Sequence, residues 1–269
     1  MMGKLKKYFD SVNIEYFAVL DYRDCREISP NIIARADMNA QSIIIYLLPY
    51  YTGEAVNISR YAVSLDYHIA ISEINSGLTD LIKSEFPESK IKGYGDHSPI
   101  DERHAAIIGG LGILGDNGLI INEKYGSYVF VGDVVTDIDP KLLGAMPPQK
   151  LRVCERCGAC KKNCPTGILR FEGEDCLSAI TQRKGELRDD ECSLMRKYNT
   201  AWGCDLCQSV CIHNKNPEKT PVEFFYRDRI EHLTREALDS MTDEEFSMRA
   251  YAWRKRATIS RNIDILDKK

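Results

Sequence analysis

Seven of the ten cysteines of this chain fall into two short runs, and their spacing constrains the fold more than any other feature. The first run reads C-x2-C-x2-C-x3-C before Pro165, and the second repeats its tail as C-x2-C-x3-C. The runs consist of Cys154, Cys157, Cys160 and Cys164, then Cys204, Cys207 and Cys211. The first spacing is typical of bacterial [4Fe–4S] sites, where three thiolates bind one cluster and the fourth reaches a second. With one more thiolate, from Cys176 or Cys192, the sequence predicts two such clusters.

Zinc and disulfide bonds are the alternatives for these cysteines. A zinc site needs four ligands from two C-x2-C pairs, which leaves the third and fourth cysteines of the first run unexplained. Disulfide frameworks are typical of short secreted chains. This sequence has 269 residues, and its N-terminal lysines are not followed by the apolar run of a secretory signal. No stretch approaches the roughly 18 apolar residues of a membrane-spanning helix. We therefore expect a cytoplasmic protein without a membrane partner.

The overall charge argues against a strongly basic nucleic-acid-binding protein. The formal net charge is −4, and 43% hydrophobic with 28% charged residues is an ordinary globular balance. The length suits one large domain or two modest ones. One basic group stands near the end of the sequence: Arg254, Lys255, Arg256 and Arg261. It could contact phosphates or form a solvated helix face.

Helical and strand patterns alternate before the cysteine runs. Apolar periodicity predicts helices over residues 4–12, 28–38, 63–86 (with a break near Gly77) and 100–108. β-Branched and apolar runs predict strands over 15–20, 42–48 and 91–94, and a hairpin that pairs 119–122 with 127–135. This alternation indicates an α/β N-terminal half. A proline-rich segment, 139–149, is expected to link it to the cysteines. After them, helices are expected over 242–253, with a capping box from Thr242 and Glu245, and over 255–266.

Residues 109–118 contain five glycines. The run follows a predicted helix and precedes a predicted strand, which is the reverse of a dinucleotide-binding turn. We therefore expect no dinucleotide site there. Glycines at such density suggest instead that the backbone approaches a large, flat group.

Several blocks occur in a characteristic order along the chain. They are SRYA at 59–62, DYH at 66–68, DHSPIDER at 96–103, GLGILG at 110–115, GSYVFVG at 126–132, CLSAITQ at 176–182, GCDLCQSV at 203–210 and the helix at 256–266. Together they resemble the cobalamin-dependent epoxyqueuosine reductases, which make the last change in queuosine synthesis on tRNA. The resemblance covers about residues 15–266. Asp116 and Ile113 stand where that family usually has a lysine and an aromatic residue, and Ile212 replaces a usual proline.

The resemblance implies a fold of class α+β/α/β in three parts. A nitroreductase-like, cobalamin-binding α/β domain is expected over residues 1–145, and a ferredoxin-like domain with two [4Fe–4S] clusters over 146–218. Short C-terminal helices would follow over 219–269. Family members commonly continue into a helical-repeat domain that helps hold tRNA. The sequence ends before such a domain, so a short member is expected.

The resemblance also implies an oxidoreductase. The clusters would pass electrons to the cobalt of a base-off cobalamin, and the epoxide oxygen of epoxyqueuosine would be removed. The implied partners are tRNA and a low-potential electron donor such as flavodoxin or ferredoxin. Two other functions are considered. One is a related corrinoid iron–sulfur reductase that acts on a small molecule or another corrinoid protein, and the other is a ferredoxin-like electron carrier.

The resemblance further assigns site residues. By position, Asp96 matches the family's proposed proton donor, and an oxygen that leaves as an alkoxide needs such an acid nearby. The alternative is that Asp96 caps the helix expected near Pro99. The cobalamin-binding candidates are Arg60, Tyr67, Asp96, Asn117, Ser127, Ser178, Thr181 and Gln182. The ligands implied for one cluster are Cys154, Cys157, Cys160 and Cys211. Those for the other are Cys164, Cys176, Cys204 and Cys207, which leaves Cys25 and Cys192 without a metal.

Overall fold

A computed structural model describes residues 1–169 and 175–268 of the chain. Its backbone contacts divide the chain into two compact units, each built from several segments. Unit 1 comprises residues 1–49, 68–115 and 119–155, and unit 2 comprises 50–67, 116–118 and 156–269. The chain therefore passes between the units several times, and the N-terminal half contributes residues to both.

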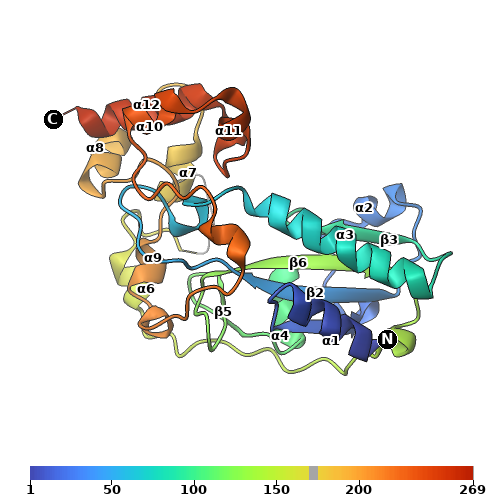
Figure 1. The fold of residues 1–269 in the computed structure, drawn as a ribbon. Coiled ribbons are helices and arrows are strands. Elements are labelled where there is room, and N and C mark those ends of the chain that lie inside the picture. Colours follow the sequence, from blue (N-terminus) through green and yellow to red (C-terminus); the bar gives the residue numbers. More distant parts are fainter. Residues whose placement is uncertain (170–174, 269) are drawn as a thin grey trace. The chain divides into compact units, whose positions relative to one another are not determined.

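Unit 1 is built on a four-stranded sheet (Figure 1). Its strands are β1 (Phe17–Asp21), β2 (Ser42–Pro49), β6 (Val129–Thr136) and β3 (Ile91–Tyr94), in the order β1-β2-β6-β3, and every neighbouring pair is antiparallel. β2 is buried along its whole length. Its unbroken run of apolar residues fits this position, because helices cover both faces of the sheet.

Alternate residues of β2 face opposite helical layers, as the strand period of two requires. On one face, Tyr46 donates a hydrogen bond to Asn75 of α3 (Tyr67–Glu85; 3.0 Å) and its ring lies near Phe9 of α1 (Met2–Ser11). On the other face, Ile45 packs in a cluster with Ala105 of α4 (Glu102–Ile108). α2 (Pro30–Arg35) adds to that second layer, and α5 (Pro140–Leu143) packs against β1 and β2.

The predicted hairpin in the glycine-rich region is wrong. β5 (Ile120–Ile121) pairs with β4 (Ile113–Leu114), while β6 joins the large sheet between β2 and β3. Gly112 makes the short pairing possible, because a Cβ there would lie 2.6 Å from the carbonyl oxygen of Ile121. Only the turn of the expected hairpin remains, as a single bridge between Asn122 and Gly126.

The long predicted helix does not break at Gly77. α3 runs without interruption from Tyr67 to Glu85. A Cβ at Gly77 would collide with the hydroxyl end of Tyr8, whose hydroxyl donates to the carbonyl oxygen of Ile74 (2.7 Å). The glycine therefore allows α1 to approach α3 closely, which outweighs its cost of about 1 kcal/mol within a helix.

Unit 2 consists of short helices and turns around two apolar clusters. One cluster surrounds Trp202 and Tyr251, and the other joins Leu177 and Ile180 to Met195. The helices are α6 (Ala159–Asn163), α7 (Leu177–Gln182), α8 (Asp189–Lys197), α9 (Leu206–Ser209), α10 (Arg235–Ser240), α11 (Asp243–Ser247) and α12 (Arg256–Asp267). Turns of 3₁₀ type occur at Arg60–Ala62, Ile212–Asn214, Glu223–Tyr226 and Ala252–Arg254.

The predicted capping box at Thr242 and Glu245 is confirmed, and it opens α11. The helix expected over 242–253 is divided, because α11 ends at Ser247 and a 3₁₀ turn follows. Lys255 then adopts a left-handed φ of 68° directly before α12 begins. Within residues 1–169 and 175–268, no helix combines the length and apolar character needed to cross a bilayer.

Candidate functional site

The two cysteine runs form matching helical turns in unit 2. Cys160 lies in α6 and Cys207 in α9, and these two short helices pack against each other. Cys164 ends α6, and Cys211 follows α9 directly after its last turn. The shared C-x2-C-x3-C spacing therefore produces the same local arrangement twice, with one thiol on the helix and one just beyond it.

Three thiols of these runs and the thiol of Cys176 are linked electrostatically. Burial, with smaller contributions from negative charge on Cys176 and Cys164, raises the pKa of Cys207 to about 12. Burial likewise raises the pKa of Cys204 to about 12, with contributions from Cys176 and Cys207. The structure thus brings together Cys164, Cys176, Cys204 and Cys207. Without metal, buried thiols resist ionisation, and iron would supply the positive charge that stabilises them as thiolates.

The other predicted set is described only in part. Burial raises the pKa of the Cys160 thiol, and the charges of Asp116 and Cys211 raise it further, so these groups lie near one another. Cys157 is exposed in unit 2. Cys154 lies at the end of unit 1, where its N–H donates to the carbonyl oxygen of Leu114 (2.9 Å).

Among the described residues, no three His, Cys, Asp or Glu side chains converge closely enough to hold a single metal ion. In a [4Fe–4S] cluster each cysteine binds a different iron, so its ligands do not converge on one point. Asn117 adds a feature that suits a cluster. It is buried, and its side chain hydrogen-bonds the thiol of Cys207, which lowers the pKa of that thiol. Such a donor to a ligand sulfur is one of the means by which proteins adjust cluster potentials.

Arg60, expected to bind cobalamin, contacts the loop of the second cysteine run. Its N–H and one guanidinium nitrogen donate to Asp205 (2.7 and 3.2 Å), and the same nitrogen donates to Ser209 (3.2 Å). Ser59 also donates to Asp205. Gly203 has a left-handed φ of 71°, and a Cβ there would lie 2.5 Å from the Cβ of Ser59. The SRYA segment therefore fixes the backbone on which Cys204 and Cys207 lie.

The three candidates after Cys176 lie on α7 and bond one another. Gln182 donates to the Ser178 hydroxyl (3.2 Å), and the Thr181 hydroxyl donates to the Ser178 carbonyl oxygen (2.7 Å). Thr181 is fully buried and accepts a hydrogen bond from the N–H of Gly203 (3.0 Å). Asn262 of α12, also fully buried, donates to the carbonyl oxygens of Thr181 and Ala201 (both 2.7 Å). Thr181 therefore braces α7 against the segment that leads into Cys204.

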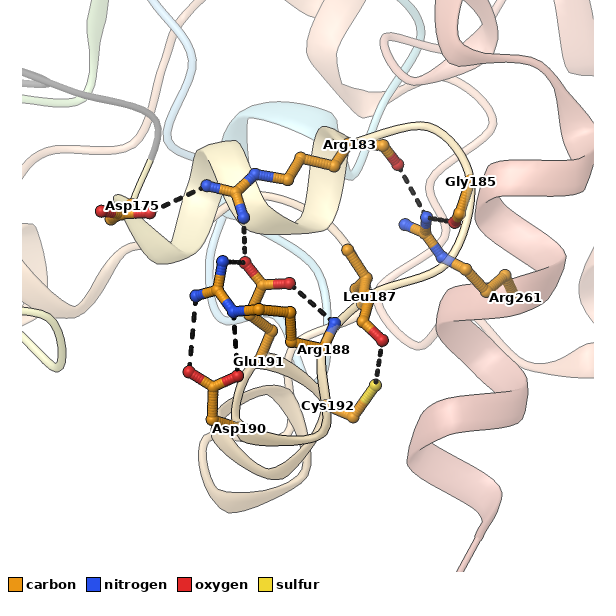
Figure 2. A network of polar contacts seen from close by, with 9 residues as sticks. All are labelled: Asp175, Arg183, Gly185, Leu187, Arg188, Asp190, Glu191, Cys192 and Arg261. Atoms are coloured by element: carbon orange, nitrogen blue, oxygen red, sulfur yellow. Dashed lines mark hydrogen bonds and ion pairs between the residues drawn. The ribbon is translucent and has the colours of Figure 1, made fainter.

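A polar network fixes the segment from α7 to α8 (Figure 2). Buried Glu191 pairs with Arg183 and Arg188, and Arg183 also pairs with Asp175 (2.9 Å), immediately before Cys176. Arg261 reaches in from α12 and donates to the carbonyl oxygens of Arg183 (2.8 Å) and Gly185. Cys192 lies beside this network, where its thiol donates to a backbone carbonyl oxygen.

The basic group near the end of the sequence divides by role. Arg256 donates to the carbonyl oxygens of Leu238 and Met241 (2.6 and 3.1 Å), and Arg261 belongs to the network above. Arg254 lies over the ring of Trp253, 4.0 Å from its centroid. Trp253 and Lys255 are exposed. Two of the four basic side chains therefore hold local structure.

Asp96 lies in the loop 95–99 between β3 and α4. The alternative that Asp96 caps the following helix is wrong, because Asp101 is the N-cap of α4 and accepts a hydrogen bond from the N–H of His104 (3.2 Å). Asp96 and His97 both adopt left-handed backbone conformations, with φ of 56° and 52°. This conformation is unfavourable for residues other than glycine and is often associated with functional sites.

His68 is the neighbour of Asp96 that the sequence interpretation left without a role. Its Nε2 lies 3.5 Å from Oδ2 of Asp96, and about half of each side chain is exposed. Both belong to unit 1. A cavity of about 410 Å³ opens between α3 and β3 in the same unit, and its lining includes His68, Tyr94 and Gly95. The DYH block was the available sequence signal for His68.

The remaining candidates are dispersed. Tyr67 begins α3, with its ring edge-on to that of Tyr61 (6.5 Å between centroids). Ser127 is buried in unit 1.

The sequence interpretation also missed four side chains that organise the sites: Glu102, Asp133, Asp205 and Asn262. All four contact partners more than 20 residues away in the sequence, so local patterns carry no signal for them.

No family model matches the chain, but curated proteins and solved structures of the epoxyqueuosine reductase family do. The epoxyqueuosine reductase of Gloeobacter violaceus is 30% identical over 243 residues, covering 83% of this chain and 71% of its own. The structure of the epoxyqueuosine reductase from Streptococcus thermophilus has a TM-score of 0.77 at 22% identity, covering 98% of this chain and 80% of that one. An epoxyqueuosine reductase solved with an epoxyqueuosine-modified tyrosine tRNA stem loop has a TM-score of 0.76 at 22% identity, with the same coverage. The structures establish the shared mixed α/β fold with C-terminal helices, and the sequence match places this chain in the epoxyqueuosine reductase family of oxidoreductases.

Proposed function

We propose that this chain reduces epoxyqueuosine to queuosine in tRNA. The sequence match over most of both chains carries this proposal. Further support comes from a family structure solved with an epoxyqueuosine-modified tRNA stem loop.

Iron–sulfur clusters and cobalamin are the proposed cofactors. One [4Fe–4S] cluster has Cys154, Cys157, Cys160 and Cys211 as ligands, and the other has Cys164, Cys176, Cys204 and Cys207. Support comes from the spacing of the two runs and from the mutual influence of the thiols near α9. When bound, the clusters would supply electrons singly and cobalamin would supply the reducing metal.

The proposed arrangement follows the three parts expected from the sequence. A nitroreductase-like domain over residues 1–145 holds cobalamin, a ferredoxin-like domain over 146–218 holds the clusters, and residues 219–269 brace it. The proposed cobalamin-binding residues are Arg60, Tyr67, Asp96, Asn117, Ser127, Ser178, Thr181 and Gln182. A flavodoxin or ferredoxin is the proposed electron donor.

Conversion of an epoxide into an alkene removes the oxygen as water and consumes two electrons and two protons. Asp96 donates a proton to the epoxide oxygen as its carbon–oxygen bond breaks. His68 orients the Asp96 carboxyl group and provides a second group able to carry a proton at neutral pH. The left-handed backbone at Asp96 keeps its carboxyl group partly exposed, where a substrate can reach it.

The test is the modified-nucleoside content of tRNA in a strain that lacks the gene. Deletion should replace queuosine with epoxyqueuosine, and the wild-type gene should restore it. Asp96→Asn should restore little or none while the protein retains its cofactors, because an amide does not donate a proton in this way. Glu73→Gln, on the exposed side of α3, is the matched control and should restore queuosine fully. Normal queuosine in the deletion strain would contradict the proposed function.

A further inference from the structure

Two carboxyl groups meet in the interior of unit 1. Asp133, in the middle of the sheet on β6, is completely buried, and Oε1 of Glu102 at the start of α4 is buried as well. With both groups ionised, this oxygen and both Asp133 oxygens have no donor in hydrogen-bond geometry among the described residues. The carboxyl groups are nevertheless close enough to hydrogen-bond each other once one is protonated. If one group keeps its proton, it can donate a hydrogen bond to the other, which two ionised carboxylates cannot do.

The two carboxyl groups flank the loop that carries Asp96, one beside each end of it. Asp133 is the cross-strand partner of Tyr94, the last residue of β3 before the loop. Glu102 is the first residue of the helix that follows the loop. Ser98, inside the loop, is also buried, and its hydroxyl group lies near Asp133 and lowers the pKa of that carboxyl group. Contact between the two carboxyl groups therefore joins β6, at its pairing with the last residue of β3, to the start of α4.

The loop needs such a constraint. Left-handed backbone at Asp96 and His97 costs roughly 1 kcal/mol or more for each residue, and it persists only where the surroundings impose it. At the start of the loop, a Cβ on Gly95 would lie 2.7 Å from Ile71 of α3, so the backbone is held against that helix. The carboxyl pair supplies the corresponding attachment at the other end.

The surroundings of the pair favour one retained proton. The groups around Asp133 are neutral or acidic: Tyr46 of β2, Tyr94 of β3, Cys25 and Glu102, each with a pKa that Asp133 raises. The charges acting on Glu102 are those of Asp133, Asp96 and Asp101. Burial, the larger cause, raises the pKa of Glu102 to about 9 and that of Asp133 to about 7. Two ionised carboxylates at this distance would repel each other in a low-dielectric interior.

We propose that Glu102 and Asp133 share one proton, and that this contact, the carboxyl clamp, holds loop 95–99 in the conformation that presents Asp96. Both are positioning residues that act through the loop backbone. The consequence for catalysis rests on the proposed function, whereas the clamp itself does not.

Hydrogen exchange of the loop amides in the cluster-loaded protein tests the clamp without any assay of activity. Opening the clamp above about pH 5 releases the shared proton, because a solvated carboxyl group has a pKa of about 4. After correction for the intrinsic exchange rate, protection of Asp96, His97 and Ser98 should fall about tenfold per pH unit between about pH 7 and about pH 9, where the closed pair holds one proton. In Glu102→Gln the amide group donates to Asp133 without a titrating proton, so protection should persist and vary little with pH.

Glu102→Ala should lose protection at every pH, because a methyl group cannot make the contact between α4 and Asp133, and Glu73→Gln should behave as the wild type. The infrared band of a protonated carboxyl group should be present in the wild type at neutral pH and absent from Glu102→Gln. Equal pH dependence in the wild type and Glu102→Gln, or an absent band in the wild type, would overturn the clamp. A protein that shows this pH-dependent protection and this infrared band but forms no queuosine would contradict the proposed function and leave the clamp intact.

Discussion

At the scale of single residues, the neighbours of the thiols predict how the cluster potentials are set. Asn117 hydrogen-bonds the thiol of Cys207, and a donor to a ligand sulfur stabilises the more negative, reduced cluster. Asn117→Leu keeps a similar volume and removes the donor. If that hydrogen bond contributes about 1 kcal/mol, the potential of the cluster bound by Cys207 should fall by roughly 40 mV. A redox titration followed by EPR measures this shift.

Asp116 provides the opposing variant. Its negative charge acts on Cys160, so Asp116→Asn should raise the potential of the cluster that Cys160 binds. A shift of the same sign in both variants would show that general disturbance of residues 116–118, rather than these specific interactions, controls the potentials.

The buried carboxyl pair predicts how stability depends on pH. In the unfolded chain both groups ionise near pH 4, whereas in the folded chain burial raises their pKa values to about 7 and about 9. Between these limits the folded state holds more protons than the unfolded state. The free energy of unfolding should therefore fall as pH rises, by on the order of 1.4 kcal/mol per pH unit for each proton retained.

Asp133→Asn removes one titrating group and the negative neighbour of Glu102, so its stability should fall less steeply with pH. Urea unfolding at about pH 6 and about pH 8 measures both slopes. Glu73→Gln, which removes an exposed carboxyl group from the same unit, should keep the wild-type slope. Parallel slopes for Asp133→Asn and the wild type would refute this account of the pair.

At the scale of elements, Asn262 connects α12 to the cluster-bearing segments through two buried hydrogen bonds. Asn262→Ala leaves the carbonyl oxygens of Thr181 and Ala201 without this donor in a buried environment. The expected loss is about 2–4 kcal/mol in the free energy of unfolding, from two unsatisfied buried acceptors. Urea unfolding measures it, with Asp267→Ala at the exposed end of the same helix as the control. A loss below about 0.5 kcal/mol, as for ordinary surface substitutions, would show that water replaces the side chain.

Elements with a strong local signal were predictable. β2 combines a long β-branched run with a terminal proline, and the capping box at Thr242 lies where its spacing indicates. The pairing in the glycine-rich region was not predictable, because β4 and β5 have only two residues each and show no periodicity. Gly77 was misread as a helix break, since the reason for it is the ring of Tyr8, almost 70 residues away.

At the scale of the whole molecule, each unit is built from several separate segments of the chain, which the spacing of the sequence motifs cannot reveal. Segments 50–67 and 116–118 belong to the unit that carries most of the cysteines. Arg60 contacts Asp205 across 145 positions of sequence, and Asn117 contacts Cys207. The motif resemblance selected both residues as important, but only the fold reveals that each contacts the loop of the second cysteine run.

The iron content of the whole protein tests the proposed ligand set, including the choice that spacing left open between Cys176 and Cys192. Charge on Cys176 acts on Cys204 and Cys207, whereas the Cys192 thiol donates to a backbone carbonyl oxygen beside the Glu191 network (Figure 2). The reconstituted wild type should hold about eight irons, as two [4Fe–4S] clusters require. Cys176→Ser should bind less iron and lose its second EPR signal, because a hydroxyl group is a poor substitute for a thiolate. Cys192→Ser, a substitution of the same size, should retain the full content, and a loss of iron from Cys192→Ser alone would reverse the assignment.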